Sequence, residues 1–116
     1  MSGREDDLYI YRAIVVSVYD GDTIRVDWDL GASIWMRNEP IRLYGINAPE
    51  VRGEERPEGL VARDWLREKL IGKSVIMRTI KDAKGKYGRY LGIIYLDGEN
   101  INEALIEAGM AQAAVY

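Results

Sequence analysis

The alternation of apolar and polar residues predicts a strand most clearly in "IRVDWDL", near the start of the chain. Its apolar positions fall on one face and its charged positions on the other, as in a strand with one buried side. The preceding "YRAIVVSVYD" is rich in β-branched residues and predicts another strand, and "DGDT" at 20–23 predicts a tight turn between the two. The apolar positions of "IRVDWDL" are Ile24, Val26, Trp28 and Leu30.

A third strand and a helix are expected next. The strand runs from about 34 to 44, and Pro40 predicts a sheet edge or a bulge within it. Residues 51–58 are charged and predict a loop, at whose end Pro57 suits the first turn of a helix. The helix follows in "GLVARDWLREKLIG", where apolar residues recur near helical spacing and Gly72 is a suitable stop.

The remaining sequence adds two strands and a second helix. "SVIMRTI" and "YLGIIYL" predict strands on either side of a connection rich in lysine and glycine. A helix over about 101–108 has Asn100 as N-cap, Glu103 at the capping-box position and Gly109 as its stop. Three strands, a helix, two strands and a helix favour a mainly β, α+β fold: a five-stranded Greek-key barrel of the OB type. We expect a tail over residues 1–12 and one domain over 13–116.

Composition limits the chemistry that this fold can perform. The 116 residues include no cysteine and no histidine, so disulfides, thiolate metal sites and the usual zinc ligands are excluded. Any metal must be held by oxygen, which favours calcium or magnesium. The net charge of −3 argues against a protein that grips nucleic acid over its whole surface.

The chain carries no signal for a membrane. No apolar run approaches the length of a membrane span, and the polar, acidic "MSGREDDLY" is unlike a signal peptide. Because a leader can be removed before a protein matures, the compartment stays open between cytoplasmic and secreted.

Unusual polar groups gather in three segments that are distant in sequence: "DGDT" at 20–23, "RLYGINAPE" at 42–50 and "KYGR" at 86–89. Each also has a purely structural interpretation, as a hairpin turn, a strand whose Arg42 faces water, and a solvated hairpin tip. The last segment lies in a local concentration of positive charge, however, and such a patch is suited to phosphates. Its basic residues are Arg78, Lys81, Lys84, Lys86 and Arg89.

Four motifs in order resemble the staphylococcal nuclease, or thermonuclease-like, family. They are "YDGDTIRV", "IRLYGINAPE", "KYGRYLGIIYLDG" and "INEALIEAGMA", and the resemblance extends from about Ala13 to Ala111. It implies the same OB-type barrel with helices. It also implies a nuclease (a hydrolase, often an endonuclease) that cleaves DNA and RNA with one calcium ion, two arginines and a glutamate.

The resemblance assigns a role to each residue that matches a family motif. The metal would be held by the Asp22 carboxylate, the Asn47 side chain and the Ala48 backbone carbonyl. Asp20 would support these ligands from behind without contacting the ion. Glu50 would orient or deprotonate the attacking water.

The phosphate and the rest of the substrate would be bound by basic and aromatic residues. Arg42 and Arg89 would contact the phosphate in the transition state, and Lys86 would face a neighbouring phosphate. Tyr87 would face a base or sugar, with a surface tyrosine beside a turn as the alternative. Lys84 would add to the basic hairpin that holds the substrate.

Elementary chemistry supports this set of groups. A phosphodiester gathers negative charge on its nonbridging oxygens in the transition state, and a guanidinium is a planar fork that matches two such oxygens. In a chain without histidine, a carboxylate is the natural base for a water polarised by a metal.

Two departures from the family weaken the expected site. Asn47 stands where most active members carry a second metal-binding aspartate, so one calcium ion would bind more weakly. The chain stops at Tyr116, where many members continue into a third helix, and Tyr116 is only a weak candidate for a substrate-facing tyrosine.

Three functions are therefore weighed. The first is a metal-dependent nuclease, acting as a monomer on single-stranded or locally melted DNA or RNA and without a membrane partner. The second is a catalytically weak or inactive OB module that binds nucleic acid or a protein partner, which Asn47 and the acidity of the chain favour. A purely structural barrel is third, since it leaves the clustered charges without a role.

Overall fold

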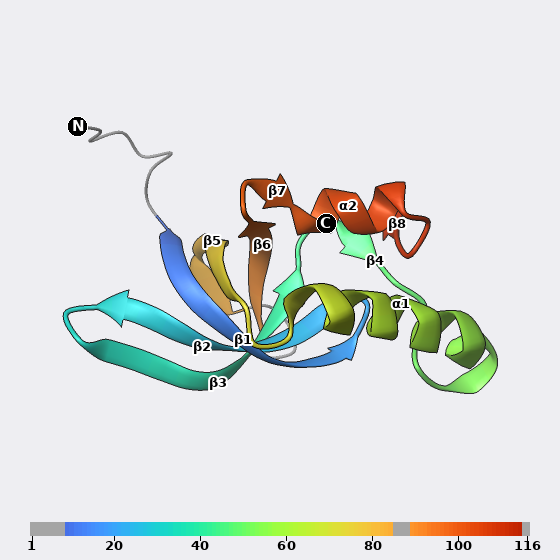
Figure 1. The fold of residues 1–116 in the computed structure, drawn as a ribbon, viewed down its shortest axis with the longest axis horizontal. Helices are drawn as coiled ribbons and strands as arrows, with labels where there is room; N and C mark the ends of the chain where they lie inside the picture. The colour runs from blue at the N-terminus through green and yellow to red at the C-terminus, as the bar shows by residue number, and fades with distance from the viewer. Residues whose placement is uncertain (1–8, 85–88, 115–116) are drawn as a thin grey trace.

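The computed structural model describes residues 9–84 and 89–114, and for 81–84 it describes the backbone alone. Long strands form the barrel, and the structure also contains two helices and several short strands (Figure 1). In chain order the elements are β1 (Ile10–Asp20), β2 (Thr23–Gly31), β3 (Ile34–Leu43), β4 (Ile46–Asn47), the 3-10 turn η2 (Gly53–Glu55), α1 (Arg56–Leu70), β5 (Ser74–Lys84), β6 (Tyr90–Leu96), β7 (Glu99–Asn100), α2 (Ile101–Glu107) and β8 (Gln112–Ala113).

The main sheet closes on itself. Its strand order is β3-β2-β1-β5-β6-β7, and β3 also pairs with β6. That pairing is parallel and joins residues 41–43 to residues 90–92, whereas the other pairings are antiparallel. The result is a closed five-stranded barrel with two helices, so the predicted OB-type fold is confirmed.

The interior of the barrel is built on the predicted alternation. Ile24, Val26 and Trp28 are buried, and the Trp28 ring meets Tyr11 and Tyr90 edge to face, with ring centroids 5.2 and 4.9 Å apart. Leu30, the last apolar position of the pattern, is 38% exposed. Leu30 is next to the last residue of β2, beside the β2–β3 turn. This hairpin extends beyond the barrel (Figure 1), so the apolar alternation continues past the buried part of the strand.

Pro40 lies in β3 at a sheet edge, as predicted. It pairs with Arg25 of β2, and pairing with β6 begins only at Ile41, so the missing N–H of the proline costs no ladder bond on that side. The register shifts just before it, where Asn38 adopts a positive φ of 54°. An irregularity and an edge therefore both occur at this point of the strand.

Helix α1 begins earlier than the sequence pattern indicates. Residues 51–58 were expected to form a loop, which is wrong in its second half, because η2 occupies Gly53–Glu55 and α1 begins at Arg56. Pro57 lies in the first turn of the helix, as predicted. The start of the helix could not be predicted from the pattern, because the acidic and basic residues of this segment show no apolar periodicity. The helix ends at Leu70, and Gly72 follows with a φ of +76°.

The N-cap of α2 is the predicted one. The Asn100 Oδ1 accepts the N–H of Glu103 at 3.1 Å. The next residue, Asn102, is buried at 4% exposure, and its amide ties α2 to the barrel. Its Oδ1 accepts from the N–H of Ile94 at 3.1 Å, and its Nδ2 donates to the carbonyl oxygens of Tyr44 and Gly92 at 2.9 and 3.1 Å.

Two further sequence expectations concern the chain start and membranes. β1 begins at Ile10, so its first three residues, 10–12, lie in the segment predicted to be a tail. Among the described residues, no helix is long and apolar enough to cross a membrane.

We predict that Asn102→Ala lowers the free energy of unfolding by about 3 kcal/mol, because it leaves the buried N–H of Ile94 and the carbonyl of Tyr44 without a partner. Asn100→Ala, which removes only the helix cap, should cost about 1 kcal/mol. Chemical denaturation of the three proteins measures both differences. Equal costs for the two variants would contradict the anchoring role of Asn102.

Candidate active site

Three segments distant in sequence meet at one end of the barrel. They are the turn between β1 and β2, the end of β3 with the turn that follows it, and the residue that precedes β6. The short pairing of β3 with β6 brings the last two together, since Arg42 lies opposite Leu91, two residues from Arg89. These are the segments in which sequence reasoning placed the unusual polar groups.

Asp22 lies at the centre of this meeting point and is 8% exposed. Its Oδ2 accepts the N–H of Ala48 at 2.8 Å, which fastens the turn after β3 to the start of β2. Its Oδ1 accepts the hydroxyl of Thr23 at 3.2 Å. The N–H of Asp22 in turn donates to Asp20 Oδ1 at 3.0 Å. This bond is the side-chain-to-backbone contact expected of an aspartate at the start of a turn.

Arg42 bridges two of the predicted metal ligands. Its Nη2 donates to Asn47 Oδ1 at 2.6 Å and lies 3.4 Å from Asp22 Oδ2, and its Nη1 donates to the carbonyl of Leu43 at 2.8 Å. The side chain of Arg42 is 13% exposed, so the alternative that it simply faces water does not hold.

Arg89 joins the same network from the β6 side. Its Nη1 donates to Thr23 Oγ1 at 3.1 Å, and that hydroxyl donates to Asp22. Thr23 is buried and was not singled out in the sequence. A threonine directly after an aspartate in a turn is too common to indicate a site by itself. It is nevertheless the link between the second arginine and the central carboxylate.

Burial raises the pKa of Asp20 to about 7, helped by the neighbouring Asp22 carboxyl and opposed by Arg42. A raised carboxyl pKa means that Asp20 is protonated, and so uncharged, for part of the time at neutral pH. Asp20 therefore adds less than a full negative charge beside Asp22 and the Arg42 guanidinium.

Glu50 lies in the turn after β4 and is exposed. Its N–H points to Glu55 Oε1 at 3.5 Å, the limit of a weak hydrogen bond. Gly59 of α1 packs against the backbone of Glu50. A Cβ at Gly59 would overlap the Glu50 carbonyl group. Gly59 therefore lets α1 pack directly on the segment that carries Glu50.

A second close approach lies at Gly21. A Cβ there would be 2.6 Å from the Ala48 Cβ and 2.9 Å from the Ala62 Cβ, closer than real Cβ atoms come. The β1–β2 turn, the turn after β3 and α1 thus meet with only small residues between them. Sequence reasoning missed Gly59 and Ala62. Two small residues three apart on a helix are the one signal that could have indicated a close contact.

Part of the predicted substrate surface lies outside the described residues. Lys86 and Tyr87 fall there, as does Tyr116. Lys84 ends β5 and pairs with Tyr90 through its backbone. The roles assigned to these residues remain predictions.

The oxygens gathered here are of the kind that hard cations bind. Within the described ranges, no three or more His, Cys, Asp and Glu side chains are placed so that they could hold a metal ion together, so an amide or backbone oxygen would have to complete any cation site. Asp22 Oδ2 and Asn47 Oδ1 both contact the Arg42 guanidinium. The space between them thus accommodates positive charge, and the donor set fits a calcium-like ion. Ala48 faces Asp22 through its N–H.

Comparison with known proteins points to the same family that the sequence motifs resemble. The family described as "Staphylococcal nuclease homologue" matches residues 40–116. The thermonuclease of Staphylococcus hyicus is 33% identical over 105 residues, which cover 88% of this chain and 59% of that protein. The thermonuclease of Staphylococcus intermedius is 32% identical, with 89% and 60% covered. Endonuclease YncB of Bacillus subtilis is 29% identical, with 82% and 44% covered.

The chain therefore spans about three fifths or less of the length of these relatives. The family match takes in the last four residues of β3, both helices, β5 and β6, and so includes Arg42, Asn47, Glu50 and Arg89. The similarity to the thermonucleases extends over most of the chain. On its fold, its motifs and these matches, the chain belongs to the staphylococcal nuclease family.

Proposed function

We propose that the protein is a metal-dependent nuclease that hydrolyses phosphodiester bonds in DNA, RNA or both. The observation that carries this proposal is the single network that joins Arg42 and Arg89 to Asp22. Arg42 contacts the Asp22 carboxylate directly, and Arg89 is linked to it through Thr23. Two guanidiniums held in this way can bind one phosphate group. Nuclease names among the relatives support the same reaction class.

The chain's own residues divide the work between phosphate and water. Arg42 and Arg89 hold the nonbridging oxygens and stabilise the charge that develops there, which is usually the largest contribution to catalysis. Glu50 accepts a proton from the attacking water through a carboxylate oxygen. Lys84, Lys86 and Tyr87 guide the neighbouring part of the substrate.

The metal would be calcium, held by the Asp22 carboxylate, Asn47 Oδ1 and the Ala48 carbonyl, with Asp20 behind them. When bound, the ion would polarise the phosphate and lower the pKa of its water. For this arrangement, Arg42 has to turn from Asn47 towards the substrate phosphate. Since Asn47 brings no charge, we expect weak calcium affinity.

A second candidate is a nucleic-acid-binding module without strong catalysis. The contact of 2.6 Å between Arg42 and Asn47 favours it, because an arginine that satisfies the metal ligands competes with both metal and phosphate. Digestion of single-stranded DNA by the purified protein, with calcium, with magnesium and with chelator, separates the two candidates. Cleavage that depends on metal supports the nuclease, and binding without cleavage supports the module.

Arg42→Lys and Arg89→Lys should each lower kcat by about a hundredfold, because lysine lacks the fork that holds two phosphate oxygens. Arg25→Lys is the matched control, since Arg25 is exposed on β2 and contacts the Asn38 carbonyl. Steady-state digestion of single-stranded DNA measures the effect. Near-normal turnover in either site variant would remove that arginine from the mechanism.

Asn47→Asp should tighten calcium binding about tenfold by adding a formal charge to the ligand set, and Asp22→Ala should abolish binding. Asn38→Asp in the exposed hairpin provides the same change of charge away from the site. Calorimetric titration with calcium measures affinity for all four proteins. If Asn47→Asp and Asn38→Asp give the same affinity as the wild type, the assigned metal site is incorrect.

Gly59→Ala should lower both stability and kcat, although glycine to alanine within a helix ordinarily stabilises by about 1 kcal/mol. The added Cβ would overlap the Glu50 carbonyl and push the Glu50 segment away from α1. We expect kcat to fall at least tenfold. Glu58→Ala, one residue earlier in the exposed first turn, is the comparison. A variant that is more stable and fully active would show that the contact does not position Glu50.

A further inference from the structure

Thr23 is a buried polar residue of the candidate site that the proposed mechanism does not use. It begins β2, is 8% exposed and lies opposite Arg42 in the pairing of β2 with β3. Its hydroxyl lies 3.1 Å from Arg89 Nη1 and 3.2 Å from Asp22 Oδ1. A buried hydroxyl needs hydrogen-bond partners, and both partners of this one are charged groups of the site.

The direction of these two hydrogen bonds follows from the groups that make them. A guanidinium has donors and no acceptor, so the hydroxyl oxygen of Thr23 accepts from Arg89. The single hydroxyl proton is then donated to Asp22 Oδ1, while Asp22 Oδ2 accepts the N–H of Ala48. Both oxygens of Asp22 are acceptors, which suits the ionised carboxylate. The negative charge of Asp22 therefore polarises the hydroxyl that Arg89 contacts.

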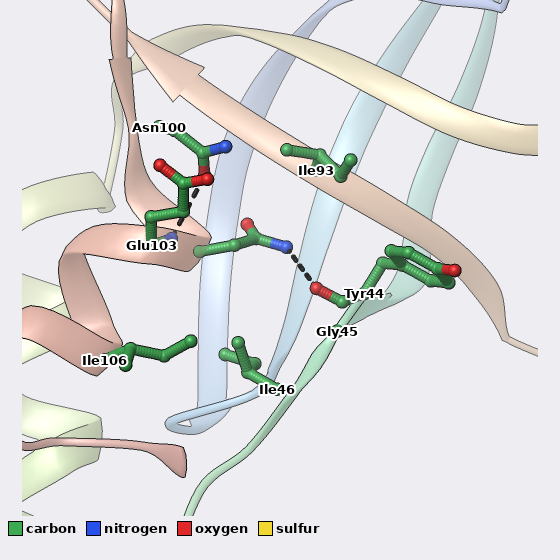
Figure 2. Close-up of a pocket in the computed structure, with 8 residues that line it drawn as sticks. Tyr44, Gly45, Ile46, Ile93, Asn100, Glu103 and Ile106 are labelled. Carbon is green, nitrogen blue, oxygen red and sulfur yellow. Dashed lines mark hydrogen bonds between the residues drawn. The ribbon is translucent and has the colours of Figure 1, made fainter. Parts of the chain in front are cut away.

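The backbone around the candidate site is fixed by other contacts. β3 and β6 pair from Ile41 and Tyr90 onward, so the backbone next to Arg89 has a set position. On the α2 side, the amide of Asn102 donates to the carbonyl of Tyr44 at 2.9 Å (Figure 2). An arginine side chain keeps much rotamer freedom beyond a fixed backbone, however. Contacts of the guanidinium itself have to determine where its charge lies.

The two arginines depend on the Thr23 hydroxyl to different degrees. Arg42 contacts Asp22 Oδ2 directly and also donates to Asn47 Oδ1. Arg89 is instead linked to Asp22 through Thr23. Loss of the hydroxyl should therefore release Arg89 and leave Arg42 in place. This difference distinguishes a positioning role of Thr23 from a general loss of structure.

We propose that Thr23 is a positioning residue, whose hydroxyl holds the Arg89 guanidinium at the place where Arg89 and Arg42 contact one phosphate. Thr23 itself contacts no substrate in this proposal. The inference rests on the proposed nuclease function for its phosphate, but the effect of Thr23 on Arg89 is measurable without cleavage. A threonine that only completes the turn would instead affect stability and leave Arg89 unchanged.

Three variants separate the hydroxyl from the rest of the side chain. Thr23→Val removes the hydroxyl and keeps the branched shape, whereas Thr23→Ser keeps the hydroxyl and removes the methyl group. Thr79→Val is the matched control, because it replaces a buried threonine of β5, outside the three segments that form the site. Chemical denaturation identifies conditions under which all variants are folded, and the tests are made there.

The first test follows the arginine side chains by NMR of nitrogen-15-labelled protein. The Arg89 Nε–H signal should be that of a rigid side chain in the wild type and in Thr23→Ser. In Thr23→Val it should become that of a mobile side chain, while the Arg42 signal is unchanged. Titration with inorganic phosphate should give a Kd about tenfold higher for Thr23→Val, through loss of a hydrogen bond to a charged group. Thr23→Ser and Thr79→Val should bind phosphate as the wild type does.

The second test connects the position of Arg89 to the reaction, by steady-state digestion of single-stranded DNA. Thr23→Val should lower kcat about tenfold in the wild-type background. Its effect should be much smaller when Arg89→Lys is already present, because the two changes remove the same interaction.

The outcomes separate this proposal from the nuclease function. Equal mobility of Arg89 in the wild type and in Thr23→Val overturns the proposal, as does release of Arg89 in Thr23→Ser. A wild-type kcat in Thr23→Val overturns it as well and leaves the nuclease function standing. Release of Arg89 by Thr23→Val in a protein that does not cleave DNA supports the contact and counts against the nuclease function.

Discussion

The site depends on how closely three backbone segments approach each other at Gly21. With any larger residue there, the β1–β2 turn could not lie against Ala48 and Ala62. That approach brings the Asp22 carboxylate within 2.8 Å of the Ala48 N–H, and the hydrogen bond fixes the turn that carries Asn47 and Glu50. The chemistry of the site is therefore arranged by the absence of side chains as much as by their presence.

Charge balance explains the rest of the arrangement. A partly buried carboxylate needs a partner, and Asp22 obtains hydrogen bonds from an N–H and a hydroxyl and a nearby guanidinium. The Arg42 guanidinium contacts both the Asp22 carboxylate and the neutral amide of Asn47. An aspartate at position 47 would place a second negative charge on the same guanidinium, which would strengthen the hold on any cation. This chain thus has a site balanced by its own arginine.

The sequence predicted the barrel well because alternation records burial directly. Ile24, Val26 and Trp28 are buried as their spacing requires, and Asn100 caps its helix as its residue type suggests. The candidate site residues were identified from motifs, and the structure brings Asp22, Arg42, Asn47 and Arg89 together. Their roles in catalysis remain proposals, as does that of Glu50.

The features that could not be predicted from the sequence depend on contacts between residues that are distant in sequence. The packing of Gly59 on Glu50 joins positions that share no periodicity, and nothing local distinguishes Gly59 from a helix-weakening glycine. The burial of the Arg42 side chain could not be predicted either, because Arg42 occupies a position in the alternating pattern that would normally face solvent. The early start of α1 lies in charged residues, which carry no apolar periodicity.

The parallel pairing of β3 with β6 also has a consequence for how the chain acquires its shape. The β1–β2–β3 meander joins near neighbours, whereas this closure joins residues 41–43 to residues 90–92 across α1 and β5. Contacts between such distant positions require a large loss of chain entropy before they form, and they slow folding. Arg42 lies within this pairing, and Arg89 directly precedes it. A partly folded chain with its hairpins in place but without this pairing would accordingly contain both arginines at separate positions, because it is the pairing of β3 with β6 that brings them together.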